Sequence, residues 1–503
     1  MDSRIKQTET GKSIFKNVLY GFSTWLLPLG LSFVATPIIV RSLGNEVYGI
    51  YALVLGFIAY SFNFSIGRAI TKYIAEYSAA GKKEFIRDLI SAAFFLNLGV
   101  GVIGVLVLIF SSRWLVTDVF RIDAEYEQIS IYSLYIAAAL IFVAMLTQIF
   151  NAVLQGMHRF DVYSKIYNLN GISLIVGNIY LALNGYGVLA LLWWNLAISS
   201  ITCVVYAVSA WRLLPEFGIN FVFPVNVFRL VLSFSFGVIG YQILANLLLL
   251  FERGWITRRL GPESLTFYVV PMTLSLLMHG FISSLSLVLF PLASELQDNK
   301  EKLLRLYTKA TKIVCLLVVF IGLTFVFQSH ELLTVWIGAD FADNSYDLLI
   351  VHTVTFGLVA IQIVSWQMTE GLGFPGFNFK VFSICLITSV TLMFFLIDDF
   401  GGIGVAFARL AGFGGIFLFV FYVEKWFFES VQYRMWLRIM ATLSVSGALG
   451  VLVERLVMLS LPLTWYSLFL AVFCGGVVYC GVVWLAGYVS EDEKLLLKGL
   501  IKR

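Results

Sequence analysis

Three arginine residues lie within or at the ends of long apolar stretches of this sequence. Arg68 stands near one end of the apolar segment 48–69, and Arg253 follows Glu252 at the end of another. Arg409 lies inside a third apolar stretch and has no acidic residue within eight positions. A charge at membrane depth costs roughly 2.5–3.5 kcal/mol on insertion scales, so such residues mark candidate functional sites.

The chemistry that these arginines offer is anion binding. A guanidinium presents its N–H donors in a rigid fork that binds phosphate or carboxylate at two points. Two alternatives stay open: Glu252 could neutralise Arg253 locally, and Arg68 could extend to the lipid headgroups. Arg409 has no such explanation in the sequence, and we expect it to face a cavity.

Uncharged polar side chains recur at helical spacing in the apolar segments. Amides both donate and accept hydrogen bonds, so a row of them suits a hydroxyl-rich ligand such as a saccharide. Amides also join membrane helices to one another, and both interpretations stay open. A histidine among them fits hydrogen-bonded packing better than proton transfer. The candidate binding residues of this kind are Gln148, Asn151, Gln242, Asn246, Gln362 and His279.

No arrangement typical of an enzyme or a metal site occurs in the sequence. There is no glycine-rich phosphate loop, no paired Cys or His ligands, and no set of Ser, His and Asp that suggests a triad. The five cysteines stand within apolar runs, as small core residues do. We therefore expect no enzymatic activity, no cofactor and no nucleic-acid partner, while a coupling ion, H+ or Na+, stays open.

The composition shows which elements must position these residues. The chain has 503 residues, 60% of them hydrophobic and 13% charged, and its mean hydropathy is +0.90. A water-exposed surface needs more polar residues, so the chain is an integral membrane protein. Its long, continuous apolar runs indicate helices and not the short alternating strands of a barrel. We predict an all-α membrane bundle with fourteen spans at 18–40, 48–69, 87–110, 131–155, 167–184, 186–210, 230–252, 264–290, 309–328, 346–370, 379–397, 401–423, 439–461 and 464–487.

The distribution of Lys and Arg predicts the orientation of these spans. With the N-terminus in the cytoplasm, twenty-five of the 34 Lys and Arg residues fall in cytoplasmic segments, every lysine among them. Cytoplasmic loops carry such an excess in membrane proteins. We therefore predict that both ends of the chain are cytoplasmic. No loop on either side is long enough to fold as a domain.

A sequence pattern recurs in the second half of the chain. The segment Arg41–Tyr51 shares Arg, Leu, Gly, Glu and Tyr with Arg258–Tyr268, 217 residues later. The near-constant offset predicts a duplicated six-helix unit whose copies enter the membrane from the same side, as in parallel-repeat transporters. Two further matches lie at offsets of 215 and 217 residues: Gln155-Gly156 with Glu370-Gly371, and Gly185–Val188 with Gly402–Val405. The predicted parts are an N-terminal lobe 1–215, a C-terminal lobe 216–428, and two additional helices with a tail in 429–503.

Several segments together resemble bacterial polysaccharide-biosynthesis transporters, the O-antigen and exopolysaccharide flippases of the multidrug/oligosaccharidyl-lipid/polysaccharide exporter superfamily. The resemblance covers nearly the whole chain and is strongest over 12–160. One departure is Phe64-Ser65-Ile66-Gly67, which lacks the Asp that relatives often carry before this Gly. The segments that carry the resemblance are LGNEVYGIYAL, SIGRAITKYIAEY, FERGWITRRLG, QGMHRF and EGLGFP.

The resemblance implies two six-helix lobes around a central cavity, with two extra C-terminal helices. It implies a flippase that moves an undecaprenyl-pyrophosphate-linked oligosaccharide from the cytoplasmic to the outer leaflet of the bacterial inner membrane by alternating access. The implied partners are this lipid-linked oligosaccharide, the lipid bilayer, and the polymerase and glycosyltransferases of the same pathway. The missing acid leaves ion coupling through the second span without support.

Three alternatives were weighed against this function. A multidrug or cation antiporter of the same fold generally needs a buried carboxylate, and the first span, 18–40, contains none. A lipid II flippase of the same fold differs in substrate and is distinguished mainly by genetic rescue. A membrane glycan polymerase or ligase needs a sizeable outer catalytic loop, which this chain lacks.

Overall fold

The computed structural model describes residues 30–61, 66–79, 83–214 and 225–488, and these ranges contain helices but no strand. Within them, ten helices are long and apolar enough to cross a membrane. Two of the ten, Gln242–Glu295 and Pro375–Phe428, are 54 residues long; the first contains the predicted span 264–290 and the end of 230–252, and the second contains 379–397 and 401–423. Two shorter apolar helices, Gly30–Leu43 and Asn45–Tyr60, overlap the first two predicted spans. The all-α membrane architecture with about fourteen spans is therefore confirmed.

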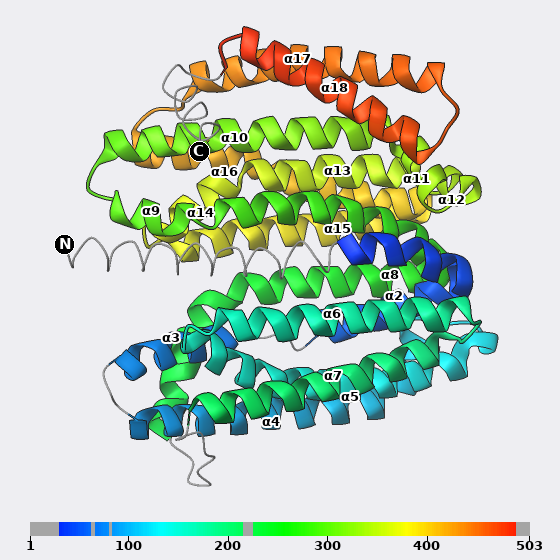
Figure 1. The fold of residues 1–503 in the computed structure, drawn as a ribbon, viewed down its shortest axis with the longest axis vertical. Helices are drawn as coiled ribbons and strands as arrows, with labels where there is room; N and C mark the ends of the chain where they lie inside the picture. The colour runs from blue at the N-terminus through cyan, green and yellow to red at the C-terminus, as the bar shows by residue number, and fades with distance from the viewer. Residues whose placement is uncertain (1–29, 62–65, 80–82, 215–224, 489–503) are drawn as a thin grey trace. The chain divides into compact units, whose positions relative to one another are not determined.

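The chain divides into two compact units, Met1–Thr266 and Phe267–Arg503. The predicted boundaries at 215 and 428 stay predictions. The helices of unit 1 are Gly30–Leu43, α2 (Asn45–Tyr60), α3 (Ile66–Ala79), α4 (Lys83–Trp114), the π-helix η1 (Leu115–Val119), α5 (Ala124–Gly156), α6 (Phe160–Leu183), α7 (Val188–Leu213) and the first part of α8 (Val225–Ser286) (Figure 1).

Unit 2 contains the end of α8 and all later helices. Its last two helices, α17 and α18, pack along each other, and α17 also packs on α10 (Figure 1). These helices are α9 (Leu289–Glu295), α10 (Lys300–Phe327), α11 (Ser329–Trp336), α12 (Ala339–Asp343), α13 (Tyr346–Ile361), α14 (Ile363–Gly371), α15 (Pro375–Gly414), α16 (Ile416–Phe428), α17 (Tyr433–Ser460) and α18 (Trp465–Leu485).

The second predicted span differs from the observed helices. The prediction was one helix over 48–69, but α2 ends at Tyr60 and α3 begins at Ile66. Helix α3 packs on α4 and α5, and its buried Ile70 and Ile74 belong to a core cluster with Leu89 of α4. Residues 62–65, between the two helices, lie outside the described part of the chain.

Residues with a left-handed backbone conformation repeat along the chain. Such residues commonly end helices, because they turn the chain away from the helix axis. Four pairs are separated by 215 to 217 residues, the offset of the sequence matches: Gly44 with Gly261, Arg121 with Gly338, His158 with Gly373, and Gly185 with Gly401. Gly261 lies inside α8 and Gly401 inside α15, where each separates two predicted spans. The backbone therefore repeats where the sequence repeats.

Polar contacts hold α6 against α7 within unit 1. Thr202 Oγ1 donates to Asn170 Oδ1 at 2.8 Å, and Asn178 Nδ2 donates to Asn195 Oδ1 at 3.0 Å. Trp194 Nε1 donates to the Ser173 carbonyl at 3.0 Å. Apolar association is weak between membrane helices because lipid is equally apolar, so such bonds and close packing hold helix pairs together.

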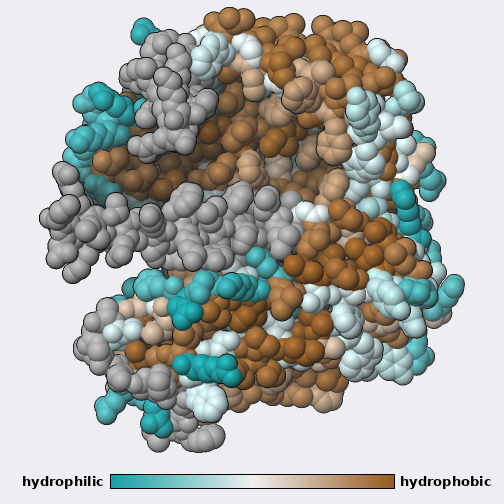
Figure 2. Space-filling model, viewed as in Figure 1, coloured by the Kyte–Doolittle hydropathy of each residue, from teal (hydrophilic) through white to brown (hydrophobic). Residues whose placement is uncertain are grey.

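Apolar side chains also cover much of the outside of each unit. Phe110 of unit 1 is 82% exposed and Leu485 of unit 2 is 86% exposed. On the face of unit 2 shown in Figure 2, hydrophobic residues cover the lengths of α17 and α18. Exposed apolar surface of this extent suits lipid as the surrounding solvent.

Candidate binding sites

A small polar pocket lies inside unit 1 and contains two of the predicted binding residues. Its volume is about 260 Å³, and Gln148 and Asn151 of α5 line it. Residues of α2, α6 and α7 complete the walls. The polar lining residues are Thr147, Gln148, Asn151, Asn170, Ser199 and Thr202, and we call this site the amide pocket.

The amide pocket offers hydrogen bonds without charge. Within it, Asn170 Oδ1 accepts from Thr202 Oγ1, which leaves the amide nitrogen of Asn170 to donate elsewhere. Amides and hydroxyls bind neutral hydroxyl groups well, and no acid or base lines the walls. The pocket is therefore suited to part of a saccharide and poorly suited to an ion pair.

A second set of buried hydrogen bonds in unit 1 joins three helices. Asn195 Nδ2 of α7 donates to the hydroxyl of Tyr51 in α2 at 3.3 Å, while Asn195 Oδ1 accepts from Asn178 of α6. Tyr51, Asn178 and Asn195 are all buried. Their mutual bonds indicate a structural role, because buried amides in lipid need partners.

Arg253 of α8 reaches the backbone of α2. It is 8% exposed, and its Nη1 donates to the Ala52 carbonyl of α2 at 2.6 Å. Its guanidinium also lies 5.5 Å from the centre of the Tyr60 ring. A Cβ added at Gly56 would lie 2.6 Å from Arg253 Cδ, so the side chain packs directly on the α2 backbone. Arg253 thus connects α8 to α2, and one guanidinium nitrogen already has a backbone partner.

Arg409 lies in a buried cluster of unit 2. It comes from α15, is 4% exposed, and its Nη1 lies 3.3 Å from the sulfur of Met272 in α8. Its guanidinium stands 5.2 Å from the centre of the Phe356 ring of α13. Sulfur and aromatic faces are weak partners for a cation. We call Arg409, Met272, Phe356 and the residues that adjoin them the arginine cluster.

The arginine cluster includes a histidine that sequence reasoning missed. His352 of α13 is fully buried, and its ring meets the Tyr268 ring edge-on with centroids 4.6 Å apart. Neither ring nitrogen of His352 makes a hydrogen bond within the described ranges. His279, which was predicted, reaches the same Phe356 ring at 6.3 Å. The cluster therefore brings together Arg409 and His279, while His352 gave no signal because it stands alone in an apolar run.

Gln362, Gln242 and Asn246 do not line the amide pocket. Gln362 lies at the junction of α13 and α14, 5% exposed, and its Oε1 has no hydrogen-bond partner within the described ranges. Gln242 and Asn246 are half-buried on α8. Arg68 falls within α3, but its side chain lies outside the described part of the chain. Their roles in binding stay predictions.

A long apolar groove runs along α17 in unit 2. Its volume is about 1090 Å³, its walls come from α10, α13, α16 and α17, and Arg455 is the only charged residue that lines it. From Trp436 to Arg455, α17 rises about 28 Å at ~1.5 Å per residue, close to the thickness of a bilayer's hydrocarbon core. We call this groove the slot; among its lining residues are Val319, Leu323, Phe417, Phe421, Trp436, Met440, Ser444, Gly447, Ala448 and Arg455.

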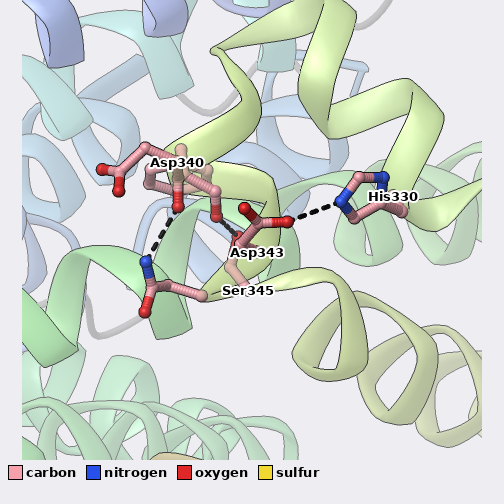
Figure 3. A network of polar contacts seen from close by, with 6 residues as sticks. His330, Asp340, Asp343 and Ser345 are labelled. Atoms are coloured by element: carbon pink, nitrogen blue, oxygen red, sulfur yellow. Dashed lines mark hydrogen bonds and ion pairs between the residues drawn. The ribbon is translucent and has the colours of Figure 1, made fainter.

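A polar network between α11 and α13 is a local structural feature. His330 Nε2 lies 2.7 Å from Asp343 Oδ1, and Ser345 Oγ donates to the Phe341 carbonyl at 2.6 Å (Figure 3). The His330 and Asp343 side chains are 44% and 67% exposed, so this pair contributes little stability. The network fixes the turn that leads into α13, on which His352 lies.

Comparison with known proteins identifies the family of this chain. Residues 38–345, more than half of the chain, match the family described as "Polysaccharide biosynthesis protein". The chain belongs to this family. As a polysaccharide biosynthesis protein it also resembles the "Putative O-antigen transporter" of Shigella flexneri, with 22% identity over 405 residues that cover 78% of this chain and 93% of the relative. The predicted family is confirmed.

Solved structures show the fold of this polysaccharide biosynthesis protein. The lipid II flippase MurJ in an inward closed conformation matches it with a TM-score of 0.73 at 16% identity, over 94% of this chain and 99% of the other. An inward-facing multidrug resistance MATE family transporter of the MOP superfamily matches with a TM-score of 0.66 at 16% identity, over 80% and 99%. These likenesses confirm a multi-pass transporter fold. Their low identity leaves the substrate undecided.

Proposed function

We propose that this protein is a flippase that moves an undecaprenyl-pyrophosphate-linked oligosaccharide, an O-antigen or exopolysaccharide repeat unit, from the cytoplasmic to the outer leaflet by alternating access. Such a substrate has three chemically distinct parts: a long apolar chain, an anionic pyrophosphate and a neutral saccharide. The described residues offer a site suited to each part. Family membership and the transporter fold support the same class of function.

The observation that carries this proposal is the slot. An apolar groove of membrane length offers nothing to a small water-soluble substrate, whereas it matches a polyprenyl chain in polarity and in length. The slot is apolar along its length and meets a cation only at the Arg455 end. Filling it with a lipid chain restores the dispersion contacts that an empty apolar groove lacks.

The polar parts of the substrate fit the two other sites. The arginine cluster offers the buried guanidinium of Arg409 to a pyrophosphate, with favourable Coulomb energy in a low-dielectric setting. The amide pocket, with its volume of about 260 Å³, matches saccharide hydroxyls in size and polarity. No step requires a covalent bond to form, which agrees with the expectation of a transporter and not an enzyme.

The proposal is tested in the host by deleting the gene and restoring it on a plasmid. Loss of surface polysaccharide, with accumulation of the undecaprenyl-linked repeat unit in the inner membrane, is the expected result. Restoration by the gene should reverse both effects. Normal surface polysaccharide in the deletion strain, or loss of lipid II export instead, would contradict the proposal and favour another cargo.

A further inference from the structure

The carboxylate of Glu424 joins three helices at one end of the slot. Glu424 lies in α16 and is completely buried. Its Oε1 accepts from the Tyr307 hydroxyl of α10 at 2.7 Å and from Trp436 Nε1 of α17 at 2.7 Å. Its Oε2 accepts from the backbone nitrogen of Gln432, just before α17, at 2.8 Å. Hydrogen bonds to a charged acceptor are stronger than neutral ones, so this is a firm junction.

A second junction fixes the other end of α17 to α10. Glu454 is 2% exposed, and its carboxylate accepts from Gln328 Nε2 at 2.7 Å and from Thr324 Oγ1 at 3.1 Å. The next residue, Arg455, donates to Glu331 of α11 and to the Phe327 carbonyl. Both ends of α17 are therefore held by buried or half-buried polar bonds.

The slot lies between these two junctions. Trp436, a donor to Glu424, and Arg455, the neighbour of Glu454, both line it. Between them α17 approaches α10 closely at Gly447, where an added Cβ would lie 2.3 Å from Leu323 Cδ1. Phe421 and Phe417 of α16 also line the slot, about one and two turns before Glu424, respectively.

An apolar groove between helices needs a reason to stay open. Protein interiors pack densely, and helices that could close an unfilled apolar space would gain contacts by doing so. The two carboxylates set the spacing of the walls: Glu424 links α16 to α10 and α17, and Glu454 links α17 to Thr324 of α10. A closer approach of these helices would distort hydrogen bonds that are costly to lose inside a membrane. Glu424 is the more decisive of the two, since only its junction includes α16.

We propose that Glu424 is a positioning residue that holds α16 and α17 at a separation suited to a polyprenyl chain, and thereby makes the protein selective for long-chain lipid phosphates. This inference rests on the proposed function, because it assumes that the slot receives the substrate's lipid chain. Glu424 itself does not contact the lipid. It acts through Trp436, which forms the end wall of the slot.

The test compares two phosphates with the same head and different chains. Binding of undecaprenyl phosphate and of farnesyl phosphate to the purified full-length protein is measured by native mass spectrometry, and the ratio of the two dissociation constants is taken. Because both ligands have the same phosphate headgroup, any binding energy that Arg409 or Arg455 adds through the phosphate cancels in this ratio. The wild type should favour the long chain by about tenfold or more, from the apolar area that the slot buries.

Substitution of Glu424→Ala should lower this ratio below about twofold while farnesyl phosphate binds as before. Tyr307→Phe removes one donor with almost no change in shape, whereas Trp436→Phe removes a donor and also shortens a side chain that lines the slot; each should give an intermediate ratio. The control is Glu429→Gln, which alters an exposed acid five residues away that bonds Lys300 on the surface. This control should leave the ratio unchanged.

A second variant keeps the inference testable if Glu424→Ala does not fold. Ala448→Trp fills the slot directly and leaves the Glu424 junction in place, so it should lower the ratio as well. A wild-type protein that binds neither phosphate would contradict the proposed function. If Tyr307→Phe, Trp436→Phe and Glu424→Ala all keep the preference of the wild type for the long chain, the role of Glu424 is overturned, while the proposed function is unaffected. Equally tight binding of a diacyl phospholipid would overturn the polyprenyl occupant.

Discussion

Arg409 places Nη1 3.3 Å from the sulfur of Met272, in a site where only 4% of the arginine is exposed. Phe356 and the edge-on pair of Tyr268 and His352 adjoin the same site. A buried guanidinium attracts an anion strongly where the surroundings have a low dielectric constant, and we expect Arg409 to bind the pyrophosphate of the proposed substrate.

Replacing Arg409 therefore tests anion binding. Arg409→Ala should reduce export of surface polysaccharide by about ten- to hundredfold, because a bond to a charged group contributes about 1.5–3 kcal/mol. Arg409→Lys should restore part of the activity, since it keeps the charge and loses the fork. Export is measured together with the amount of protein in the membrane.

The matched control for Arg409 is Arg259→Ala. Arg259 is exposed and stacks on the Trp255 ring at 5.3 Å, so its loss should leave export unchanged. Wild-type export in Arg409→Ala at normal protein levels would count against an anion site in the arginine cluster. Arg68→Ala should also lower export, which would give the first evidence on that side chain.

The amide pocket predicts selectivity for the saccharide. Asn151→Leu and Thr202→Val remove hydrogen-bonding groups from its wall with little change in volume. Each should weaken binding of a saccharide-bearing lipid by about threefold, from the ~0.6 kcal/mol typical of a membrane hydrogen bond. Binding of undecaprenyl phosphate without saccharide should not change, and an equal loss for both lipids would contradict this assignment.

The packing of α2 in unit 1 predicts a strong effect at Gly49. A Cβ there would lie 1.9 Å from the Pro262 carbonyl oxygen, a backbone atom that cannot rotate away. Gly49→Ala should lower the stability of the purified protein by about 1–3 kcal/mol, as overpacking does. Thermal unfolding in detergent measures this. Gly99→Ala is the control, because nothing lies within 4 Å of its added Cβ and stability should stay unchanged.

The ion pair of Lys300 and Glu429 predicts that stability depends slightly on pH, in a direction that can be tested. The hydrogen bond from Lys300 Nζ, and then its charge, lower the pKa of the Glu429 carboxyl. A lowered pKa adds stability above the usual glutamate value of about 4.3, and that stability is lost as the pH falls through the lowered pKa. The difference in melting temperature between wild type and Lys300→Gln should therefore be constant from neutral pH down to about pH 5 and shrink below it. A difference in melting temperature that grows on acidification would contradict the lowered pKa of Glu429.

Much of the fold could be predicted from apolar periodicity and repeated motifs. The motif at Arg41–Tyr51 and its copy at Arg258–Tyr268 located the duplication, and the left-handed Gly44 and Gly261 lie within them. The end of α2 at Tyr60 and the start of α3 at Ile66 were not predicted, because the apolar residues on both sides of Asn63 suggested a single span. Segment length predicted the spans, because the thickness of a bilayer sets the length of a membrane helix. The Lys and Arg bias predicted their orientation, which stays a prediction.

The sites were predicted less completely. Gln148 and Asn151 share the amide pocket as their helical spacing suggested, but Asn170 and Thr202 come from other helices and only tertiary packing brings them there. Arg253 was predicted as a binding residue or as a partner of Glu252, and its bond to the Ala52 carbonyl, 201 residues away in sequence, depends on tertiary packing that the sequence does not reveal. Glu424 gave no signal, because an acid near the end of a span is ordinary and its three donors lie on separate segments.

The most direct test of the central claim is flipping in liposomes. The protein is reconstituted with an undecaprenyl-pyrophosphate-linked saccharide that carries a fluorescent label, and a membrane-impermeant quencher reports how much label reaches the opposite leaflet. The account predicts protein-dependent movement that falls in Arg409→Ala and Ala448→Trp and persists in Arg259→Ala. Movement no faster than in protein-free liposomes, or equal rates in all the variants, would contradict it.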